Sequence, residues 1–343
     1  MTVDVVPTDD PIIDEGRAPR WGARLVGVLG QLGQLLAVLF AVSLLTFLLL
    51  DALPGSAVDS RIGPLPNFSP ADRAELVASM SKQLGLDKPL AWQYVIWVKN
   101  AFTGDFGVNY QGIEVSHVVG ERLTPTLELG VASIIISTVG ALLISLFGFR
   151  TRWRAIRAAI QGGATVLLVV PAFWLGLILV IIFAAELGWL PSAGFVPFGD
   201  DAGENLRFLV LPAVTLALPQ LALFYRYLDA GLRDVSTASF ITAARARGIS
   251  ERDVAYRHVL PNAILPTVTV IGLVAGSLIS GLVIVESVFS WPGLGLLLVD
   301  SVKSKDYNTV AAVVLLTAFA YVVVAFVVDV AYRLLDPRTR RQS

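Results

Sequence analysis

Few residues in this chain could carry out covalent chemistry. Its 343 residues include no cysteine and only two histidines, His117 and His258. Without cysteine there are no disulfides, thiolate metal sites or cysteine nucleophiles, and two separate histidines do not suffice for a polyhistidine metal centre. The sequence also lacks the His-Glu-x-x-His pattern of zinc proteases and the Gly-x-x-x-x-Gly-Lys-Ser/Thr loop that binds ATP phosphates. We therefore expect a chain that is not an enzyme, binds no cofactor or metal of its own and cannot hydrolyse ATP.

The most informative polar residues lie in an arginine-rich connection at residues 233–261. Residues 240–247 are good helix formers with positive charge in the last turn, and Gly248 follows where a helix end favours a left-handed residue. The adjacent Ala243 and Ala244 would give this helix a surface that a partner could approach closely. The pattern predicts a short helix that ends in a glycine turn.

A second helix is predicted directly after that turn. Ser250 has the position of an N-cap and Asp253 follows three residues later, as in a capping box with Asp in place of Glu. Ile249 and Val254 occupy the two positions of a hydrophobic staple, and Pro261 is expected to end the helix. The connection is therefore predicted to be a helix, a glycine turn and a second helix. An ordinary interfacial hairpin whose arginines meet lipid phosphates is the alternative interpretation.

The elements that position this connection are long and apolar. Hydrophobic residues make up 55% of the chain and charged residues 15%, and the mean hydropathy is +0.71. An average soluble domain has about 25% charged residues, so the composition indicates a membrane protein. A helix crosses the hydrocarbon core with about 20 apolar residues. Six windows meet that length and predict an all-α, polytopic membrane protein with six transmembrane helices: residues 25–50, 127–149, 158–184, 208–228 (broken by Pro212 and Pro219), 264–288 and 309–334.

Arginine placement predicts the orientation of these helices, because positive residues resist translocation and mark the cytoplasmic loops. Arginines gather before the first window, at residues 150–157, in the 233–261 connection and at 338–341, whereas the alternate short connections contain few positive residues. Both termini are therefore expected in the cytoplasm. The predicted parts of the chain are a disordered cytoplasmic tail (1–24), a first transmembrane helix (25–50), an extracytoplasmic segment with short helices (51–126), a five-helix core (127–334) and a cytoplasmic tail (335–343).

The connection at 233–261 resembles the EAA loop of ABC importer permeases. That loop reads Glu-Ala-Ala, three residues, Gly, nine residues and Ile-x-Leu-Pro. The matching residues of this chain, at the same spacing, are Thr242, Ala243, Ala244, Gly248, His258, Leu260 and Pro261. Thr242 replaces the glutamate of the pattern and His258 replaces the isoleucine. Both departures are similar to the loops of the dipeptide/oligopeptide/nickel branch of the family.

Seven further segments resemble the B-type permease subunit of that branch, in the same order along the chain. They are Leu84-Gly-Leu-Asp-Lys-Pro-Leu90, Gly104-Asp-Phe-Gly107, Glu121-Arg-Leu-Thr-Pro-Thr-Leu-Glu-Leu129, Pro171-Ala-Phe-Trp174, Leu187-Gly-Trp-Leu-Pro191, Val285-Glu-Ser-Val-Phe-Ser-Trp-Pro-Gly-Leu-Gly295 and Leu335-Asp-Pro-Arg338. The resemblance covers about residues 25–338. It implies the type I ABC importer permease fold, with a cytoplasmic coupling helix, in the bacterial inner membrane.

The resemblance also implies partners for a half-channel. These are a homologous C-type permease subunit, two ATP-binding subunits that hold ATP and Mg, and an extracytoplasmic substrate-binding protein. Membrane lipids surround the chain, and its net charge of −1 gives no basic surface for nucleic acid. The EAA-type loop would be the coupling helix, which sits in a groove of the ATPase. Ala243 and Ala244 would be close-packing contacts, Gly248 the turn, and Arg245 and Arg247 charge partners.

Short peptides are the substrate that the resemblance implies, and nickel chelates, glutathione or another small solute are the alternatives. An ion-coupled secondary transporter would be a protein of a different class, with ionisable residues near the middle of its spans. Here Glu128, Arg226, Glu286 and Asp329 fall near span ends, where capping or snorkelling explains them. A membrane-embedded enzyme would need a nucleophile with a base, or a metal cluster, at membrane depth, and the sequence offers neither.

Overall fold

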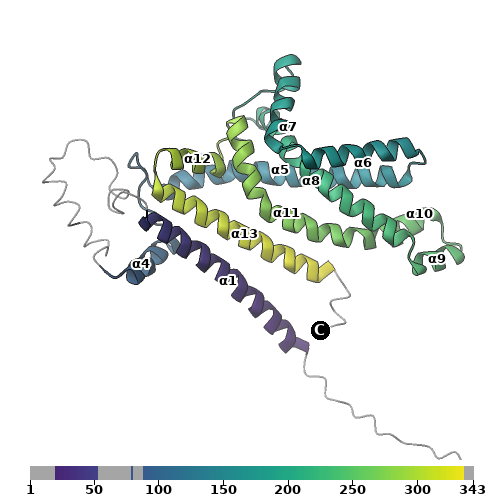
Figure 1. Cartoon of the computed structure of the whole chain (residues 1–343), viewed down its shortest axis with the longest axis horizontal. Coiled ribbons are helices and arrows are strands. Elements are labelled where there is room, and N and C mark those ends of the chain that lie inside the picture. The colour runs from purple at the N-terminus through teal and green to yellow at the C-terminus, as the bar shows by residue number, and fades with distance from the viewer. Residues whose placement is uncertain (1–19, 53–78, 80–87, 336–343) are drawn as a thin grey trace, which may run out of the picture.

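The computed structural model describes residues 20–52, 79 and 88–335, which fold almost entirely into helices (Figure 1). In chain order the main elements are α1 (Arg20–Ala52), α4 (Leu90–Phe102), α5 (Val115–Arg150), α6 (Arg154–Val169), α7 (Ala172–Leu179), the π-helix η1 (Val180–Glu186), α8 (Ala202–Ser236), α9 (Ser239–Ala246), α10 (Glu251–Asp253), the π-helix η2 (Val254–Val259), α11 (Leu260–Phe289), α12 (Leu294–Lys303) and α13 (Tyr307–Leu335). Within this part of the chain the one extended pairing is an isolated antiparallel bridge between Val108 and Glu114. The short α9 and α10 lie at one end of the molecule, and α4 and α12 lie toward the other.

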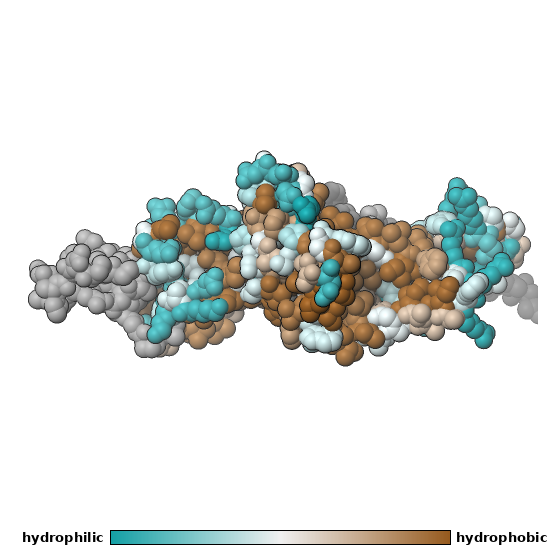
Figure 2. Space-filling model, turned by 90° about the horizontal axis from the view of Figure 1, so that it is seen from above, coloured by the Kyte–Doolittle hydropathy of each residue, from teal (hydrophilic) through white to brown (hydrophobic). Residues whose placement is uncertain are grey.

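The described helices have the length and composition of membrane spans. Five of them are long and apolar enough to cross a bilayer, or up to seven spans are present if each of two bent pairs forms one span. On the face drawn in Figure 2, hydrophobic residues dominate the middle of the molecule and hydrophilic residues gather toward both ends. This is the pattern of a protein whose middle lies in hydrocarbon and whose ends reach water. The predicted all-α, polytopic membrane fold is confirmed.

Two predicted boundaries differ from the structure. Of the tail predicted at 1–24, residues 1–19 lie outside the described residues, and residues 20–24 belong to α1. The window at 158–184 is not one straight span, because α6 and the α7–η1 helix meet at 109°. The bend lies at Pro171, which has no N–H to continue the helix and keeps the preceding Val170 extended.

Other prolines do not interrupt their helices. The window at 208–228 was predicted to be broken by Pro212 and Pro219, but α8 continues through both of them. Likewise α5 includes Pro125 and begins at Val115, well before the predicted residue 127. Because α5 and α11 pack along α8, neighbouring helices hold both halves of α8 in line where a proline removes a backbone hydrogen bond.

Helix α5 turns its large apolar side chains outward. Its exposed stripe, one residue in every four, is Leu127, Val131, Ile135, Val139, Leu143 and Phe147. Its inward stripe is made mostly of small residues: Leu129, Ser133, Ser137, Ala141, Ser145 and Gly148. Small inward residues let α8 approach closely, and a large apolar surface suits hydrocarbon or an apolar partner helix. This arrangement is the reverse of a helix on the surface of a soluble protein.

A buried carboxylate fastens α11 to α12 and α5. Glu286, near the end of α11, is fully buried. Its Oε2 accepts hydrogen bonds from the backbone N–H groups of Gly295 (2.7 Å) and Leu296 (3.0 Å), at the start of α12. The Thr126 hydroxyl of α5 donates to Oε1 over 2.8 Å and accepts from the Leu294 N–H over 2.7 Å. The carboxylate therefore caps the positive end of α12, as anions favour, and links three helices.

The turn between α11 and α12 fits closely around this carboxylate. Trp291 is fully buried and donates from Nε1 to the carbonyl oxygen of Pro125 over 2.9 Å. Its ring packs edge-to-face against Phe195, with the ring centroids 4.8 Å apart. A side chain at Gly293 would collide with the Glu286 carboxylate, so glycine is required there by close approach. The sequence left capping and snorkelling open as explanations of Glu286, and the structure shows that this carboxylate caps α12.

We expect Thr126→Val to lower the free energy of unfolding of the chain by about 1–3 kcal/mol. Valine keeps the shape of threonine but leaves the Leu294 N–H and one Glu286 oxygen without the hydroxyl that each contacts. The measurement is unfolding of the purified chain in mixed detergent micelles. Thr165→Val is the matched control, because the Thr165 hydroxyl bonds a carbonyl of its own exposed helix, and it should change stability by less than about 0.5 kcal/mol. Equal stability of both variants would show that Thr126 does not hold this junction.

Candidate functional site

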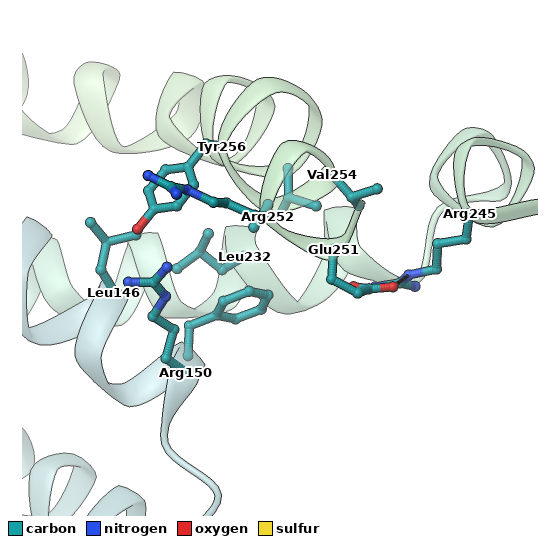
Figure 3. Close-up of a pocket in the computed structure, with 11 residues that line it drawn as sticks. Leu146, Arg150, Leu232, Arg245, Glu251, Arg252, Val254 and Tyr256 are labelled. Carbon is teal, nitrogen blue, oxygen red and sulfur yellow. Dashed lines mark hydrogen bonds and ion pairs between the residues drawn. The ribbon is translucent and has the colours of Figure 1, made fainter. Parts of the chain in front are cut away.

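The connection between α8 and α11 is a helical hairpin built on an apolar cluster. We call this the loop-base cluster, and its buried residues are Leu228, Leu232, Ile241, Ala244, Val254, Val259 and Ala263. They come from α8, α9, η2 and α11, and Leu142 and Phe149 of α5 pack against them. Leu232 and Val254 both line a cavity between these helices (Figure 3). The hairpin is therefore attached to the ends of three long helices by its own hydrophobic core.

The two alanines of the predicted motif face in different directions. Ala244 has 8% of its surface exposed and belongs to the loop-base cluster, next to the fully buried Ile241. Ala243 and Thr242 are exposed. Ala244 therefore contacts the core of this chain and not a surface open to a partner, which corrects the prediction that both alanines form that surface. The small surface on α9 that a partner could approach is at Ala243.

Gly248 ends α9 in the predicted left-handed conformation, with φ of +79°. The Gly248 N–H donates to the Arg245 carbonyl over 2.9 Å, and the Ile249 N–H donates to the Ala244 carbonyl over 3.3 Å. This pair of bonds is the Schellman motif, which satisfies the last carbonyls of a helix. A Cβ at Gly248 would meet no atom within 4 Å, so glycine is favoured there by backbone conformation alone.

Ser250 caps the second helix as predicted. Its Oγ accepts a hydrogen bond from the Asp253 N–H over 3.1 Å. The reciprocal half of a capping box differs, because the Asp253 carboxylate accepts from the Ser250 hydroxyl over 2.7 Å and also pairs with Arg257 at 3.3 Å. Ile249 and Val254 both contact the loop-base cluster, as a hydrophobic staple requires.

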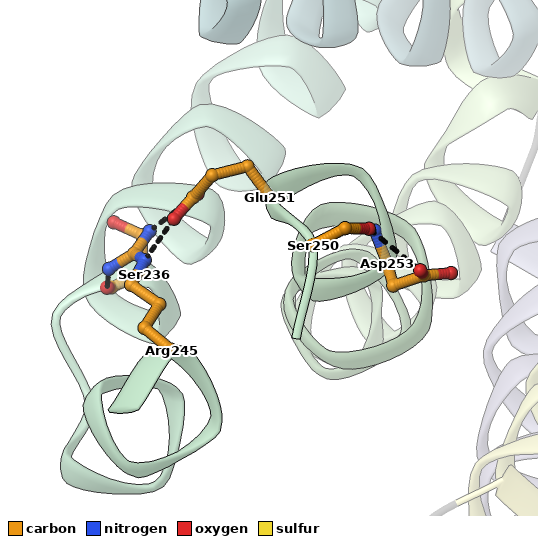
Figure 4. A network of polar contacts seen from close by, with 5 residues as sticks. All are labelled: Ser236, Arg245, Ser250, Glu251 and Asp253. Atoms are coloured by element: carbon orange, nitrogen blue, oxygen red, sulfur yellow. Dashed lines mark hydrogen bonds and ion pairs between the residues drawn. The ribbon is translucent and has the colours of Figure 1, made fainter. Parts of the chain in front are cut away.

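Arg245 forms a clip within the hairpin (Figure 4). Its Nε and one terminal nitrogen donate to the two carboxylate oxygens of Glu251 over 2.9 and 3.3 Å. Its other terminal nitrogen donates to the Ser236 carbonyl over 3.4 Å. One side chain thus joins the end of α8, α9 and the start of α10. Arg247 is exposed, and its side chain makes no hydrogen bond or ion pair with the described residues.

The helix after Ser250 does not end at Pro261, contrary to the prediction. It continues from α10 through the π-helix η2 into α11, where Pro261 lies in the first turn. Proline is tolerated there, because the wider π-turn shifts the hydrogen bonds that a regular helix would need at its nitrogen. His258 lies partly buried on η2, Leu260 packs against the loop-base cluster, and Pro261 is exposed.

Gly231 and Glu251 belong to the site but were not identified from the sequence. A Cβ at Gly231 would lie 2.7 Å from the carbonyl oxygen of Ala263, so α8 and α11 touch backbone to backbone just below the hairpin. A single glycine in a long helix carries no signal of such a contact. Glu251 could have been paired with an arginine from charge alone, but five arginines lie between residues 233 and 257 and spacing does not select one.

The geometry of this site is that of a surface for recognition of a partner. Among the described residues, no three histidine, aspartate or glutamate side chains come together as a metal site. The exposed side of α9 carries Thr242, Ala243 and Arg247, and its buried side is continuous with the ends of α5, α8 and α11. Such a hairpin can receive a partner on one side and transmit its displacement to the long helices on the other.

Comparison with known proteins gives the family of such a chain. Residues 140–341 match the family model described as "Binding-protein-dependent transport system inner membrane component". Residues 28–118 match the corresponding N-terminal model of the same kind of transport system. The larger match includes the whole hairpin and the Glu286 turn between α11 and α12.

Three curated relatives align over nearly their whole length. The glutathione transport system permease protein GsiC of Escherichia coli strain K12 is 35% identical, over 91% of this chain and 98% of its own. The oligopeptide transport system permease protein AppB of Bacillus subtilis is 35% identical, over 88% and 95%. A probable peptide ABC transporter permease protein, y4tP, of Sinorhizobium fredii is 34% identical, over 92% and 99%. The chain belongs to the binding-protein-dependent inner membrane components, the permease family of ABC importers.

Proposed function

We propose that this chain forms one half of the translocation pathway of an ATP-driven importer of short peptides, and that the α9–α10 hairpin receives the motion of the ATP-binding subunits. The observation that carries the proposal is the loop-base cluster. It fixes the hairpin to α5, α8 and α11 while Ala243 stays exposed on the opposite side of α9. Closure of two ATP-binding subunits would then move the helix ends as a rigid unit.

The proposed substrate follows from the curated relatives. Two of the three are named for oligopeptide or peptide transport, and the third for glutathione. Glutathione is itself a modified tripeptide, so all three names describe short chains of amino acids. We propose di- and oligopeptides as the cargo and glutathione as the second candidate. In either case a substrate-binding protein would deliver the cargo.

The proposed orientation has the hairpin and both termini in the cytoplasm. Figure 1 shows that α1 begins and α13 ends on the side of the molecule nearer to α9 and α10. The arginine-rich residues 150–157 connect α5 to α6 at that same end. Positive residues near span ends favour the cytoplasmic side, which supports this orientation.

The proposed complex contains four further subunits. A homologous C-type permease would complete the pathway, and two ATP-binding subunits would bind ATP and Mg beneath the hairpins. An extracytoplasmic substrate-binding protein would dock near the opposite end, where α12 lies. On this proposal the chain itself is not catalytic, and Arg247, exposed at the end of α9 and unpaired among the described residues, is available to the ATPase surface.

Replacing Ala243 with glutamate tests the proposed docking surface. We expect the variant to insert normally and to lose uptake of a labelled dipeptide by about tenfold or more, because a long side chain in a close-packed contact costs about 1–3 kcal/mol. Uptake of dipeptide and of glutathione, and ATP hydrolysis, are measured in vesicles that contain the complete complex. Ala202→Glu, an exposed alanine at the far end of α8, is the matched control and should transport normally. Normal uptake and ATP hydrolysis in Ala243→Glu would contradict the proposal, because they would show that the hairpin only lies at the membrane interface and does not dock a partner at Ala243.

The Arg245–Glu251 pair tests whether the hairpin must be held in shape. Arg245→Glu and Glu251→Arg should each lower coupled uptake, by up to about fivefold, because each breaks the clip between α9 and α10. The double charge reversal should restore most of the loss. Arg247→Glu combined with Glu251→Arg is the control, and it should show no rescue, since Arg247 has no contact with Glu251 among the described residues. If the double reversal is as defective as Arg245→Glu, then Arg245 acts on the ATPase surface instead.

Gly248 tests the importance of the turn itself. Gly248→Val should destabilise the hairpin by about 1–2 kcal/mol or more and reduce coupled uptake, because a β-branched residue resists positive φ. Gly248→Asn should retain most of the activity, since asparagine adopts the left-handed conformation readily. Both side chains enter open space, so the comparison isolates backbone conformation. The measurement is uptake by the reconstituted complex. Equal activity of the two variants would mean that the turn adjusts freely.

A further inference from the structure

A cavity of about 380 Å³ lies beside the hairpin, between α5, α8 and η2 (Figure 3). Its floor is apolar and includes Leu146, Phe149, Leu232 and Val259. Three of these residues also belong to, or pack against, the loop-base cluster, so the floor is a fixed surface. The cavity therefore has a fixed apolar floor and lies at the ends of the long helices.

Two arginines at this cavity have no carboxylate partner in the described part of the chain. Arg150 of α5 places its guanidinium carbon 5.1 Å from the centre of the Tyr256 ring and makes no ion pair. Arg252 of α10 also makes no ion pair or side-chain hydrogen bond. Figure 3 shows both side chains extending toward Tyr256, one from each side of the cavity. The Glu251 carboxylate in the lining is already paired with Arg245. The cavity thus keeps an excess of positive charge.

We propose that this cavity binds the phosphate group of an anionic phospholipid. Guanidinium groups bind phosphate oxygens in a two-pronged geometry, and the Tyr256 hydroxyl adds a further donor between them. The apolar floor accommodates the first part of an acyl chain. Basic pockets between spans at a membrane surface bind lipid head groups in this way.

The surroundings of the cavity favour a lipid over an acidic side chain of a partner protein. Phe147 and Leu143, about one and two helical turns before Arg150 on α5, are 57% and 61% exposed on the outward apolar stripe. A lipid whose head group contacts Arg150 can therefore continue along this stripe into the hydrocarbon. An acidic side chain from a partner would use the two arginines but not the apolar floor. The bound lipid would brace the hairpin against α5.

Native mass spectrometry of the full-length chain in detergent tests the proposal. Phosphatidylglycerol, phosphatidylcholine and soluble glycerol 3-phosphate are the three probes. We expect retention of phosphatidylglycerol, weak retention of phosphatidylcholine, and no displacement of the lipid by glycerol 3-phosphate. The double variant Arg150→Gln/Arg252→Gln should bind phosphatidylglycerol about thirtyfold more weakly, since each basic residue at an anionic surface contributes about fivefold. Lipid retention is measured without transport, so it is independent of the proposed function.

Two further variants make the outcome decisive. Arg152→Gln/Arg154→Gln removes the same amount of charge between α5 and α6, close to Arg150 in the chain but outside the cavity, and should retain the lipid. Arg150→Lys/Arg252→Lys keeps the charge without the planar fork, should bind with intermediate affinity, and replaces the glutamine variant if that one fails to fold. Unchanged retention in the glutamine variant, or equal loss in the control, overturns the proposal. Displacement by glycerol 3-phosphate would identify a site for soluble phosphates. In the same measurement on the complete complex, loss of the ATP-binding subunits from the glutamine variant with unchanged lipid retention would overturn the proposal and identify a protein-docking site.

Discussion

The apolar packing of the hairpin onto the long helices is the interaction on which the proposed mechanism depends. Ile241 of α9 is fully buried among residues of α8, η2 and α11. Burying a side chain of that size stabilises by about 1.5–3 kcal/mol, and several such residues share the loop-base cluster. Because close-packed interiors are nearly incompressible, a displacement of α9 cannot be absorbed inside the cluster. It must pass to the helices that contribute to it.

The same requirement for close contact explains the composition of the spans. On α5, hydroxyl and small side chains such as Ser133, Ser137 and Ala141 face α8, and large apolar side chains face outward. In hydrocarbon the hydrophobic effect does not drive helices together, so contact depends on surfaces that fit closely. Two inward serines also donate to carbonyls of their own helix, at Gly130 and Ile134, and so add no unsatisfied polar group there. The helix can then pack tightly without a charged interface.

Local chemistry predicted much of the hairpin, and the failures share a cause. The left-handed Gly248 and the Ser250 cap depend on a few neighbouring residues, and sequence reasoning identified both. The burial of Ala244, the backbone contact at Gly231 and the continuation of the helix past Pro261 depend on helices far away in the chain. The fold class and the spans were predictable because hydrophobicity is a sum over many residues, whereas the direction of one side chain is set by its tertiary neighbours.

Helix α11 connects the two ends of the molecule under tight constraints. At one end the loop-base cluster holds it through Ala263, and at the other Glu286 joins it to α12 and α5. Between them, Gly272 packs so closely against Val328 of α13 that a Cβ would collide with that side chain. A helix fixed at its ends and touched closely in its middle can move only with its neighbours. On the proposed mechanism, a rigid displacement that enters at α9 would therefore reach the turn at Trp291, on the opposite side of the span, through α11 and the helices that contact it.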